Sequence, residues 1–234
     1  MSARRVLITG SNRGIGLALT RHLLQRGDVV LAAARRPESA DALQSLAREY
    51  PHTLMILPLD VADEESIRRA AREVTQRVDG LDWLINNAGI MYEGEHITNL
   101  SADHLAHAFR VNSIGPMLMV KHFLPLLRRG HQPKICQMTS IMGSISLTEG
   151  GGYYSYRASK AALNMLSKIL SYEVRGWGIT VIIMHPGWVR TRMGGAAAPL
   201  SPEESARGIV HVLDRTTLAD TGKYLTWEGR ELPW

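Results

Sequence analysis

Tyr156 and Lys160 stand four positions apart, a spacing that places both side chains on one face of a helix. A free phenol titrates near 10, so acid-base work at neutral pH requires its pKa to fall by about three pH units, or about 4 kcal/mol. One unit charge at ~4 Å in an effective dielectric of ~20 supplies about that much. The pair therefore predicts proton transfer to a carbonyl or from an alcohol. The alternative is a core tyrosine beside a solvated lysine.

A glycine-rich turn near the N-terminus is a candidate anion site. Residues 5–9 form an apolar run that predicts a buried strand, glycines follow at 10, 14 and 16, and apolar residues at helical spacing continue to Leu24. Backbone N–H groups at such a helix start bind anions, and glycines let a pyrophosphate approach. The intervals of four and two differ from the general dinucleotide fingerprint, so a simple tight connection is the alternative.

Further apolar runs alternate with helical segments along the chain. The runs cover residues 28–34, 53–60, 81–85 and 134–138, and the helical segments cover 38–49, 64–78 and 101–128. Asp63 is the expected N-cap of the second of these helices. Strands buried on both faces and joined by helices predict an α/β fold: a Rossmann-type, doubly wound parallel sheet flanked by helices. A length of 234 residues with 45% hydrophobic content fits a single domain over 1–234.

Six motifs in this order resemble those of the short-chain dehydrogenases/reductases. They are Thr9-Gly10-x-x-x-Gly14-Ile15-Gly16, Asn86-Asn87-Ala88-Gly89, Asn112, Ser140, Tyr156-x-x-x-Lys160 and Pro186-Gly187. Residues 153–164, 185–191 and 227–234 are similar to the sniffer-type carbonyl reductases and the related C-factor proteins. The resemblance implies an oxidoreductase that transfers a hydride between a nicotinamide cofactor and a carbonyl carbon, with the protein supplying position and electrostatics.

The resemblance also implies a role for each catalytic residue. Tyr156 protonates the nascent alkoxide, and Lys160 holds the nicotinamide ribose and lowers the pKa of the phenol. Ser140, rather than its neighbour Thr139, stands three residues before a glycine and donates a hydrogen bond to the same oxygen. Asn112 holds a water that leads from Lys160 towards solvent; the alternative for it is a helix-interior amide that bonds to backbone.

The interval of 16 positions from Ser140 to Tyr156 is longer than the family usually has, so an extended loop is expected at 146–152. Tyr153 and Tyr154 have no lysine four residues on and are expected to line the loop or the pocket. The stretch 194–199 stands where the family has its substrate lid. An apolar substrate pocket is expected from Met142, Trp188 and Met193.

The remaining implied residues bind the cofactor, in part with Tyr156 and Lys160. Thr191 matches the position that contacts the carboxamide, and the turn at 186–187 lets the backbone approach the nicotinamide. The full expected set is Gly10, Asn12, Arg13, Gly14, Ile15, Gly16, Arg35, Asp60, Asn87, Ala88, Gly89, Tyr156, Lys160, Pro186, Gly187, Val189 and Thr191. Asp60 resembles the acid that contacts the adenine, and a helix-side cap is its alternative.

Charge at the end of the second strand predicts NADP as the cofactor. Enzymes of this fold that bind NAD carry a carboxylate there for the ribose 2′-hydroxyl, whereas a 2′-phosphate favours arginine. This chain has Arg35 and Arg36 at that point, Arg13 in the glycine turn, and no acid at the strand end. The planar guanidinium matches a phosphate. Solvated surface is the alternative, and it suits Arg36 better than Arg13 and Arg35 together.

Global properties limit the other classes of function. The net charge is +5, but the basic residues are scattered among acids, so no nucleic-acid partner is expected. No export signal or membrane anchor is apparent, and the single cysteine, Cys136, is expected to be buried, which favours a reducing cytoplasm. His104 and His107 share a helix face without further ligands, so no metal is expected.

Two functional hypotheses remain from the sequence. The first is an NADP-dependent reductase of a ketone, aldehyde or quinone. The second is a dinucleotide-binding signalling or regulatory protein of the C-factor type, and the two are compatible. Apolar residues in excess along 101–128 and around 161–170 also predict a homodimer or homotetramer.

Overall fold

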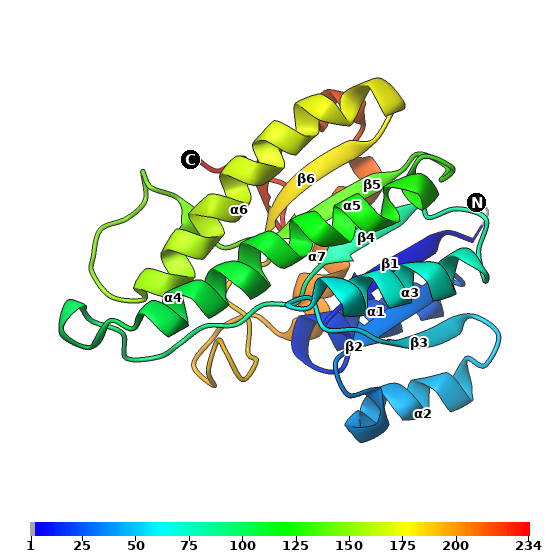
Figure 1. Ribbon diagram of the computed structural model, residues 1–234, viewed down its shortest axis with the longest axis horizontal. Helices are drawn as coiled ribbons and strands as arrows, with labels where there is room; N and C mark the ends of the chain where they lie inside the picture. Colours follow the sequence, from blue (N-terminus) through cyan, green and yellow to red (C-terminus); the bar gives the residue numbers. More distant parts are fainter. Residues whose placement is uncertain (1–2) are drawn as a thin grey trace.

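The computed structural model describes residues 3–234. The chain folds around a seven-stranded sheet, shown in Figure 1. The strands are β1 (Arg5–Thr9), β2 (Val29–Ala34), β3 (Leu54–Pro58), β4 (Trp83–Asn86), β5 (Lys134–Met138), β6 (Thr180–His185) and β7 (Lys223–Thr226). Their spatial order is β3-β2-β1-β4-β5-β6-β7, and all neighbouring strands are parallel. The predicted doubly wound parallel sheet is confirmed.

Helices cover both faces of the sheet. They are α1 (Gly14–Gln25), α2 (Asp41–Glu49), α3 (Glu64–Thr75), α4 (Ala102–Phe109), α5 (Gly115–Leu127), α6 (Tyr154–Glu173) and α7 (Pro202–Arg215). Short 3₁₀ turns follow several strands, including η4 (Ile141–Gly143) after β5. One core lies between the sheet and α1, α2 and α7, and the other lies between the sheet and α3, α5 and α6.

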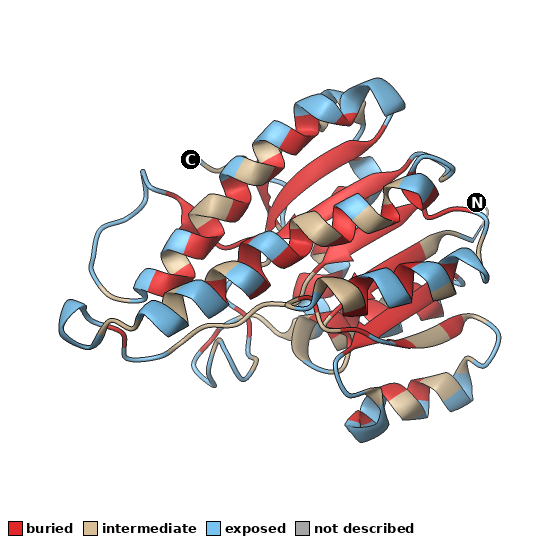
Figure 2. Cartoon of the chain, in the orientation of Figure 1, coloured by how far each residue is buried: buried red, intermediate tan, exposed pale blue. Residues whose placement is uncertain are grey.

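The strands are buried on both faces, as Figure 2 shows. In β1, Val6 and Ile8 face one core and Leu7 faces the other, which is the alternation that the pleat of a strand imposes. Burial on both faces explains why the strands appear in the sequence as continuous apolar runs rather than alternating ones. Cys136 in β5 is buried as expected.

The chain order reverses between β1 and β4. The first three strands extend outwards from β1, and the chain then returns to place β4 on its other side. In such sheets the loops that follow the two central strands diverge, and ligands bind in the crevice between them. The glycine turn after β1 and Asn87, Ala88 and Gly89 after β4 therefore meet at this position.

Several boundaries differ from the sequence prediction. The segment 101–128 contains α4 and α5 joined by a π-helical turn, η3 (Arg110–Ile114), rather than a uniform α-helix. The segment 38–49 begins with a 3₁₀ turn, and the predicted helix 64–78 ends at Thr75. Asp63 is confirmed as the N-cap of α3, where its carboxylate accepts from the Glu65 N–H at 3.0 Å. Within the described residues, none of the helices combines the length and apolar character needed to cross a membrane.

Candidate active site

The helix α6 carries Tyr156 and Lys160 on its buried face. Both side chains lie in the interior at the carboxyl end of the sheet. The Lys160 ammonium donates to the Met138 carbonyl at 2.7 Å and lies 5.7 Å from the centroid of the Tyr156 ring. The structure thus rejects the alternative of a solvated lysine and brings the predicted pair together.

The pKa of Tyr156 is raised, which corrects the expectation that Lys160 lowers it. Burial disfavours the phenolate, and the nearby Ser140 hydroxyl offsets only part of that effect. Burial lowers the pKa of Lys160 to about 8. Burial therefore outweighs any effect of the Lys160 ammonium, which donates to the Met138 carbonyl at the end of β5. Tyr156 is consequently a protonated phenol at neutral pH, the form that can donate a proton.

Ser140 begins the turn η4 directly after β5. Its hydroxyl oxygen accepts from the Met142 N–H at 3.2 Å, and the turn closes with a bond from the Gly143 N–H to the Ser140 carbonyl at 2.8 Å. The turn packs so closely on α6 that a Cβ on Gly143 would lie 2.9 Å from Lys160 atoms. Ser140 and Tyr156, which the sequence predicts as partners, come together from two elements, because Ser140 lies close enough to Tyr156 to lower the pKa of the phenol.

Asn112 lies in the π-helical turn between α4 and α5. Its amide oxygen accepts from the Ile90 N–H, and its amide nitrogen donates to the Ile90 carbonyl and to the Ser159 hydroxyl, all at 2.9–3.0 Å. The amide thus bonds to the backbone of the loop after β4 and to α6, rather than to its own helix. A Cβ on Gly89 would lie 3.4 Å from the Asn112 oxygen and 3.7 Å from the Lys160 ammonium, so Asn112 stands beside Lys160.

The glycine turn after β1 leaves the start of α1 open. Arg13 occupies the N-cap position without a side-chain cap, and the first turn of α1 has no acidic residue. Gly10 and Gly14 have left-handed backbone conformations, with φ of 69° and 53°. The Asn87 amide nitrogen donates to the Thr9 and Gly10 carbonyls, which ties this turn to the loop after β4. Uncapped N–H groups beside glycines form a suitable cradle for a pyrophosphate.

Three arginines surround this cradle. Burial and the nearby charges of Arg192 and Arg35 lower the pKa of Arg13, so both of these guanidinium groups lie near that of Arg13. None of the three forms an ion pair with an acid within residues 3–234. An acid-free cluster of this kind fits a phosphate that neutralises it.

Arg192 is a residue that the sequence prediction missed. It belongs to the segment after β6, far from Arg13 in the sequence, and only the fold brings the two together. The adjacent Thr191 confirms this approach, because its methyl group would lie 3.2 Å from a Cβ on Gly14. The segment 188–194 therefore passes over the glycine turn.

Asp60, at the exit of β3, forms a local turn. Its carboxylate accepts from the Ala62 N–H at 2.9 Å, while its own N–H donates to the Ser66 hydroxyl at 3.0 Å. These bonds lie beside the start of α3, but the N-cap of that helix is Asp63, so Asp60 does not cap it. Contact with an adenine remains a prediction.

The loop after β6 completes this end of the sheet. Gly187 has a φ of 90°, and a Cβ there would lie 2.7 Å from the Leu200 side chain. His185, just before it, accepts from the Ile141 N–H at 3.2 Å, and burial lowers its pKa to about 4. The imidazole is therefore neutral near pH 7 and fixes the residue that follows Ser140. The sequence prediction did not identify His185, since a single histidine carries no distinguishing pattern.

The predicted substrate residues lie at the carboxyl ends of β5 and β6. Met142 is half-buried in the turn after Ser140, and Trp188 and Met193 are 58% and 37% exposed. The Trp188 indole N–H donates to the Gly194 carbonyl at 2.8 Å, which fixes the segment between them. The loop expected at 146–152 is exposed over residues 146–151, with Leu147 40% accessible.

Glu95 supports the start of α6 and was also missed. Tyr153, at the N-cap position, provides no side-chain cap. The buried Glu95 carboxylate instead accepts from the Ser155 N–H at 2.9 Å and from the Ser155 hydroxyl at 2.7 Å. A lone glutamate in a loop gives no sequence signal for this role.

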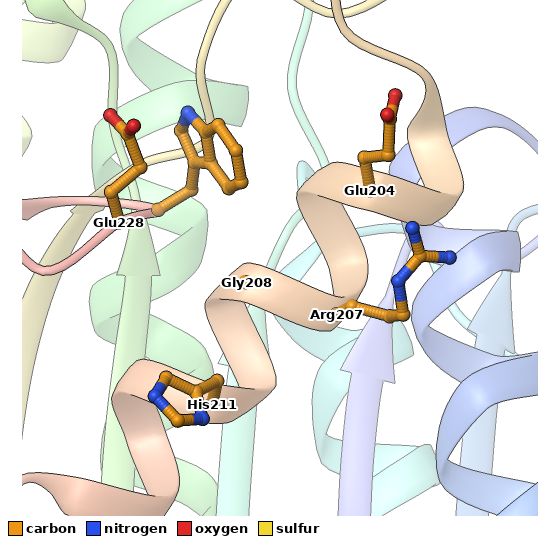
Figure 3. Close-up of a pocket in the computed structure, with 6 residues that line it drawn as sticks. Glu204, Arg207, Gly208, His211 and Glu228 are labelled. Carbon is orange, nitrogen blue, oxygen red and sulfur yellow. The ribbon is translucent and has the colours of Figure 1, made fainter.

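A separate hollow of about 370 Å³ lies between α7 and the segment after β7, as Figure 3 shows. It is lined by Glu204, Arg207, Gly208, His211, Trp227 and Glu228. The lining includes none of Ser140, Tyr156 and Lys160. We therefore place the candidate active site at the carboxyl ends of β1, β4, β5 and β6, and not in this hollow.

Comparison with known proteins establishes the family. The family described as short chain dehydrogenase matches residues 4–199. This chain belongs to the short-chain dehydrogenase/reductase family and is an oxidoreductase, as its motifs predicted.

Two solved structures match over the full length of both chains. NADPH-bound carbonyl reductase from chicken fatty liver is 39% identical with a TM-score of 0.94. The carbonyl reductase Sniffer of D. melanogaster is 32% identical with a TM-score of 0.95. The C-signal protein of Myxococcus xanthus is 38% identical over 154 residues, which cover 66% of this chain and 93% of C-signal. The resemblance to sniffer-type and C-factor proteins is confirmed.

Proposed function

We propose that this enzyme reduces a carbonyl compound to an alcohol with NADPH, and that Tyr156 donates the proton. The observation that carries the proposal is the approach of the buried Ser140 to the buried Tyr156, with Lys160 one turn further along α6. A buried, protonated phenol beside a second hydroxyl matches the needs of an oxygen that gains negative charge. The similarity to an NADPH-bound carbonyl reductase supports the same reaction.

The cofactor fits the residues present. The uncapped start of α1 suits the pyrophosphate, and the arginine cluster without an acid suits a 2′-phosphate held by Arg13 and Arg35. When bound, NADPH supplies a hydride for the carbonyl carbon. Tyr156 gives its proton to the carbonyl oxygen, Ser140 donates a hydrogen bond to that oxygen, and Lys160 binds the ribose. Asn112 orders a water beside Lys160 for proton supply.

The test uses a panel of ketones, aldehydes and quinones. The purified protein is mixed with NADPH and each compound in turn, and the absorbance of NADPH reports its consumption. We expect turnover with apolar members of the panel, because Met142, Trp188 and Met193 provide an apolar surface at the site. NADPH binding without turnover of any member would contradict the reductase proposal.

NADPH binding without turnover would favour the other candidate function, a regulatory protein of the C-factor type. The match to C-signal is the observation in its favour. A protein that only binds a dinucleotide has no need of Ser140, Tyr156, Lys160 and Asn112 together, so we place the reductase first.

Assembly is a further part of the proposal. Many of the apolar residues expected at an interface pack in the protein's own core, Val120, Phe123 and Leu163 among them. Met165, Ile169 and Tyr172 remain exposed along one side of α6, at spacings of four and three. We expect these side chains to pair two copies of the chain, so light scattering at micromolar concentration should give at least twice 25.9 kDa. A mass of one chain would contradict the pairing.

A further inference from the structure

The relative position of Ser140 and Tyr156 depends on how two elements meet. Ser140 belongs to the turn after β5, whereas Tyr156 belongs to α6. If this turn shifted on the helix, the two hydroxyl groups would no longer reach the same carbonyl oxygen. Misplacement by about 1 Å can cost about 10²-fold in rate, so a contact that fixes the turn on α6 has a catalytic consequence.

Asn164 provides such a contact from within α6. It lies two helical turns after Tyr156 and is buried, with 3% of its surface exposed. Its amide oxygen accepts from the Thr139 hydroxyl at 2.6 Å, and its amide nitrogen donates to the Gly143 carbonyl at 3.1 Å. One side chain therefore holds the residue before Ser140 and the residue that closes the turn.

The Thr139 hydroxyl also lies 3.5 Å from the Lys160 carbonyl of α6, and two further hydrogen bonds of the turn come from the sheet. The Tyr224 hydroxyl of β7 donates to the Ser140 carbonyl at 2.5 Å, and His185 of β6 accepts from the Ile141 N–H. These bonds hold the turn on the sheet. Asn164 differs from them because it lies on the helix that carries Tyr156, and so it fixes the turn relative to the proton donor itself.

We propose that Asn164 is a positioning residue that sets the alignment of the Ser140 and Tyr156 hydroxyl groups through Thr139 and Gly143. The inference rests on the proposed reductase function for its catalytic consequence. An asparagine suits this position because one amide offers both an acceptor and a donor, and both of its partners are buried. A leucine of similar size would fill the space but form neither bond.

The test compares Asn164→Leu with wild type, using a carbonyl substrate from the panel. We expect kcat to fall about 10- to 100-fold, with the KM and the NADPH dissociation constant changed by less than about threefold. Thr139→Val removes one of the two bonds of Asn164, together with the 3.5 Å contact to the Lys160 carbonyl, and should lose less; Thr139→Ser, which keeps the hydroxyl, should retain the wild-type rate. Ser167→Ala is the matched control: its buried hydroxyl lies one turn further along α6 and has no partner within residues 3–234.

A double-mutant cycle separates positioning from general damage. If Asn164 acts through Ser140, Asn164→Leu should cause little further loss of kcat in a Ser140→Ala background. An equal loss in both backgrounds, or a wild-type kcat for Asn164→Leu alone, would overturn the proposal. If Asn164→Leu does not fold, the same cycle with Thr139→Val decides.

A measurement without substrate tests the contact itself. In Asn164→Leu, amide hydrogen exchange should accelerate across residues 139–144, because the Gly143 carbonyl loses its bond to Asn164. Exchange in α6 should stay unchanged. Unchanged exchange at 139–144 would overturn the positioning role. If wild type turned over no carbonyl, the reductase proposal would fail while this exchange measurement still decided whether Asn164 holds the turn.

Discussion

Tyr156→Phe is expected to abolish carbonyl reduction and to leave NADPH binding nearly unchanged, because the substitution removes only the hydroxyl group. General acid catalysis contributes about 10²- to 10⁴-fold to the rate of a reaction, so kcat should fall by at least about 10²-fold. Burial keeps the phenol protonated at neutral pH, which makes Tyr156 a ready donor in the reductive direction. Steady-state kinetics and a fluorescence titration with NADPH measure the two quantities separately.

Tyr50→Phe is the matched control for this experiment. Tyr50 follows α2 and precedes β3, at the amino end of the parallel strands, so the loss of its hydroxyl should leave kcat within about twofold of wild type. If Tyr156→Phe retained most of the rate on the same substrate, another group would have to supply the proton, and the assignment of Tyr156 would be wrong.

Lys160→Ala extends the same prediction to the second member of the pair. We expect it to weaken both kcat and NADPH binding, because Lys160 is proposed to hold the ribose and to stand beside the water of the proton supply. The ammonium also binds the Met138 carbonyl, so thermal unfolding must show that the variant is folded. Lys168→Ala in the same helix is the control. If Lys160→Ala lowered kcat but left NADPH binding intact, the proposed ribose contact would be contradicted.

The second large effect concerns cofactor selectivity. Replacing Arg13 and Arg35 together with glutamine should weaken NADPH by about 100-fold and NADH by less than about threefold. Charged hydrogen bonds contribute about 1.5–3 kcal/mol each, and only NADPH carries the 2′-phosphate that these guanidinium groups would pair with. Both dissociation constants must be measured at one ionic strength, because salt screens exposed charges.

The control is Arg21→Gln, which removes a positive charge from the exposed side of α1. It should affect both cofactors little. Equal weakening of NADPH and NADH in the double variant would refute the 2′-phosphate assignment, and it would leave general electrostatic attraction as the explanation for the basic cluster.

The sequence by itself determined the architecture and indicated the residues that we propose as the catalytic set. A strand that is buried on both faces appears in the sequence as a continuous apolar run. A helix that is buried on one face appears as apolar residues at helical spacing, so the two patterns distinguish the strands from the helices. The spacing of Tyr156 and Lys160 is sufficient, without any tertiary contact, to place both on one helix face. Family motifs added Ser140 and Asn112, which have no distinctive periodicity of their own.

Tertiary structure alone decided the protonation of the pair. The sequence predicted that Lys160 would lower the pKa of Tyr156, but burial raises that pKa, and the ammonium bonds to the Met138 carbonyl. A pKa depends on the desolvation and direction of every neighbouring dipole, and these are fixed only when β5 and α6 pack together. The π-helical turn that holds Asn112 likewise left no mark in the pattern of 101–128.

Arg192 and Asn164 show the same limit for contacts between distant segments. Arg192 approaches Arg13 because the segment after β6 crosses the turn after β1, and Asn164 reaches Thr139 and Gly143 because the turn after β5 packs on α6. Local spacing encodes which side of an element a residue occupies. It does not encode which element lies opposite, since that depends on the strand order and on the packing of the whole sheet.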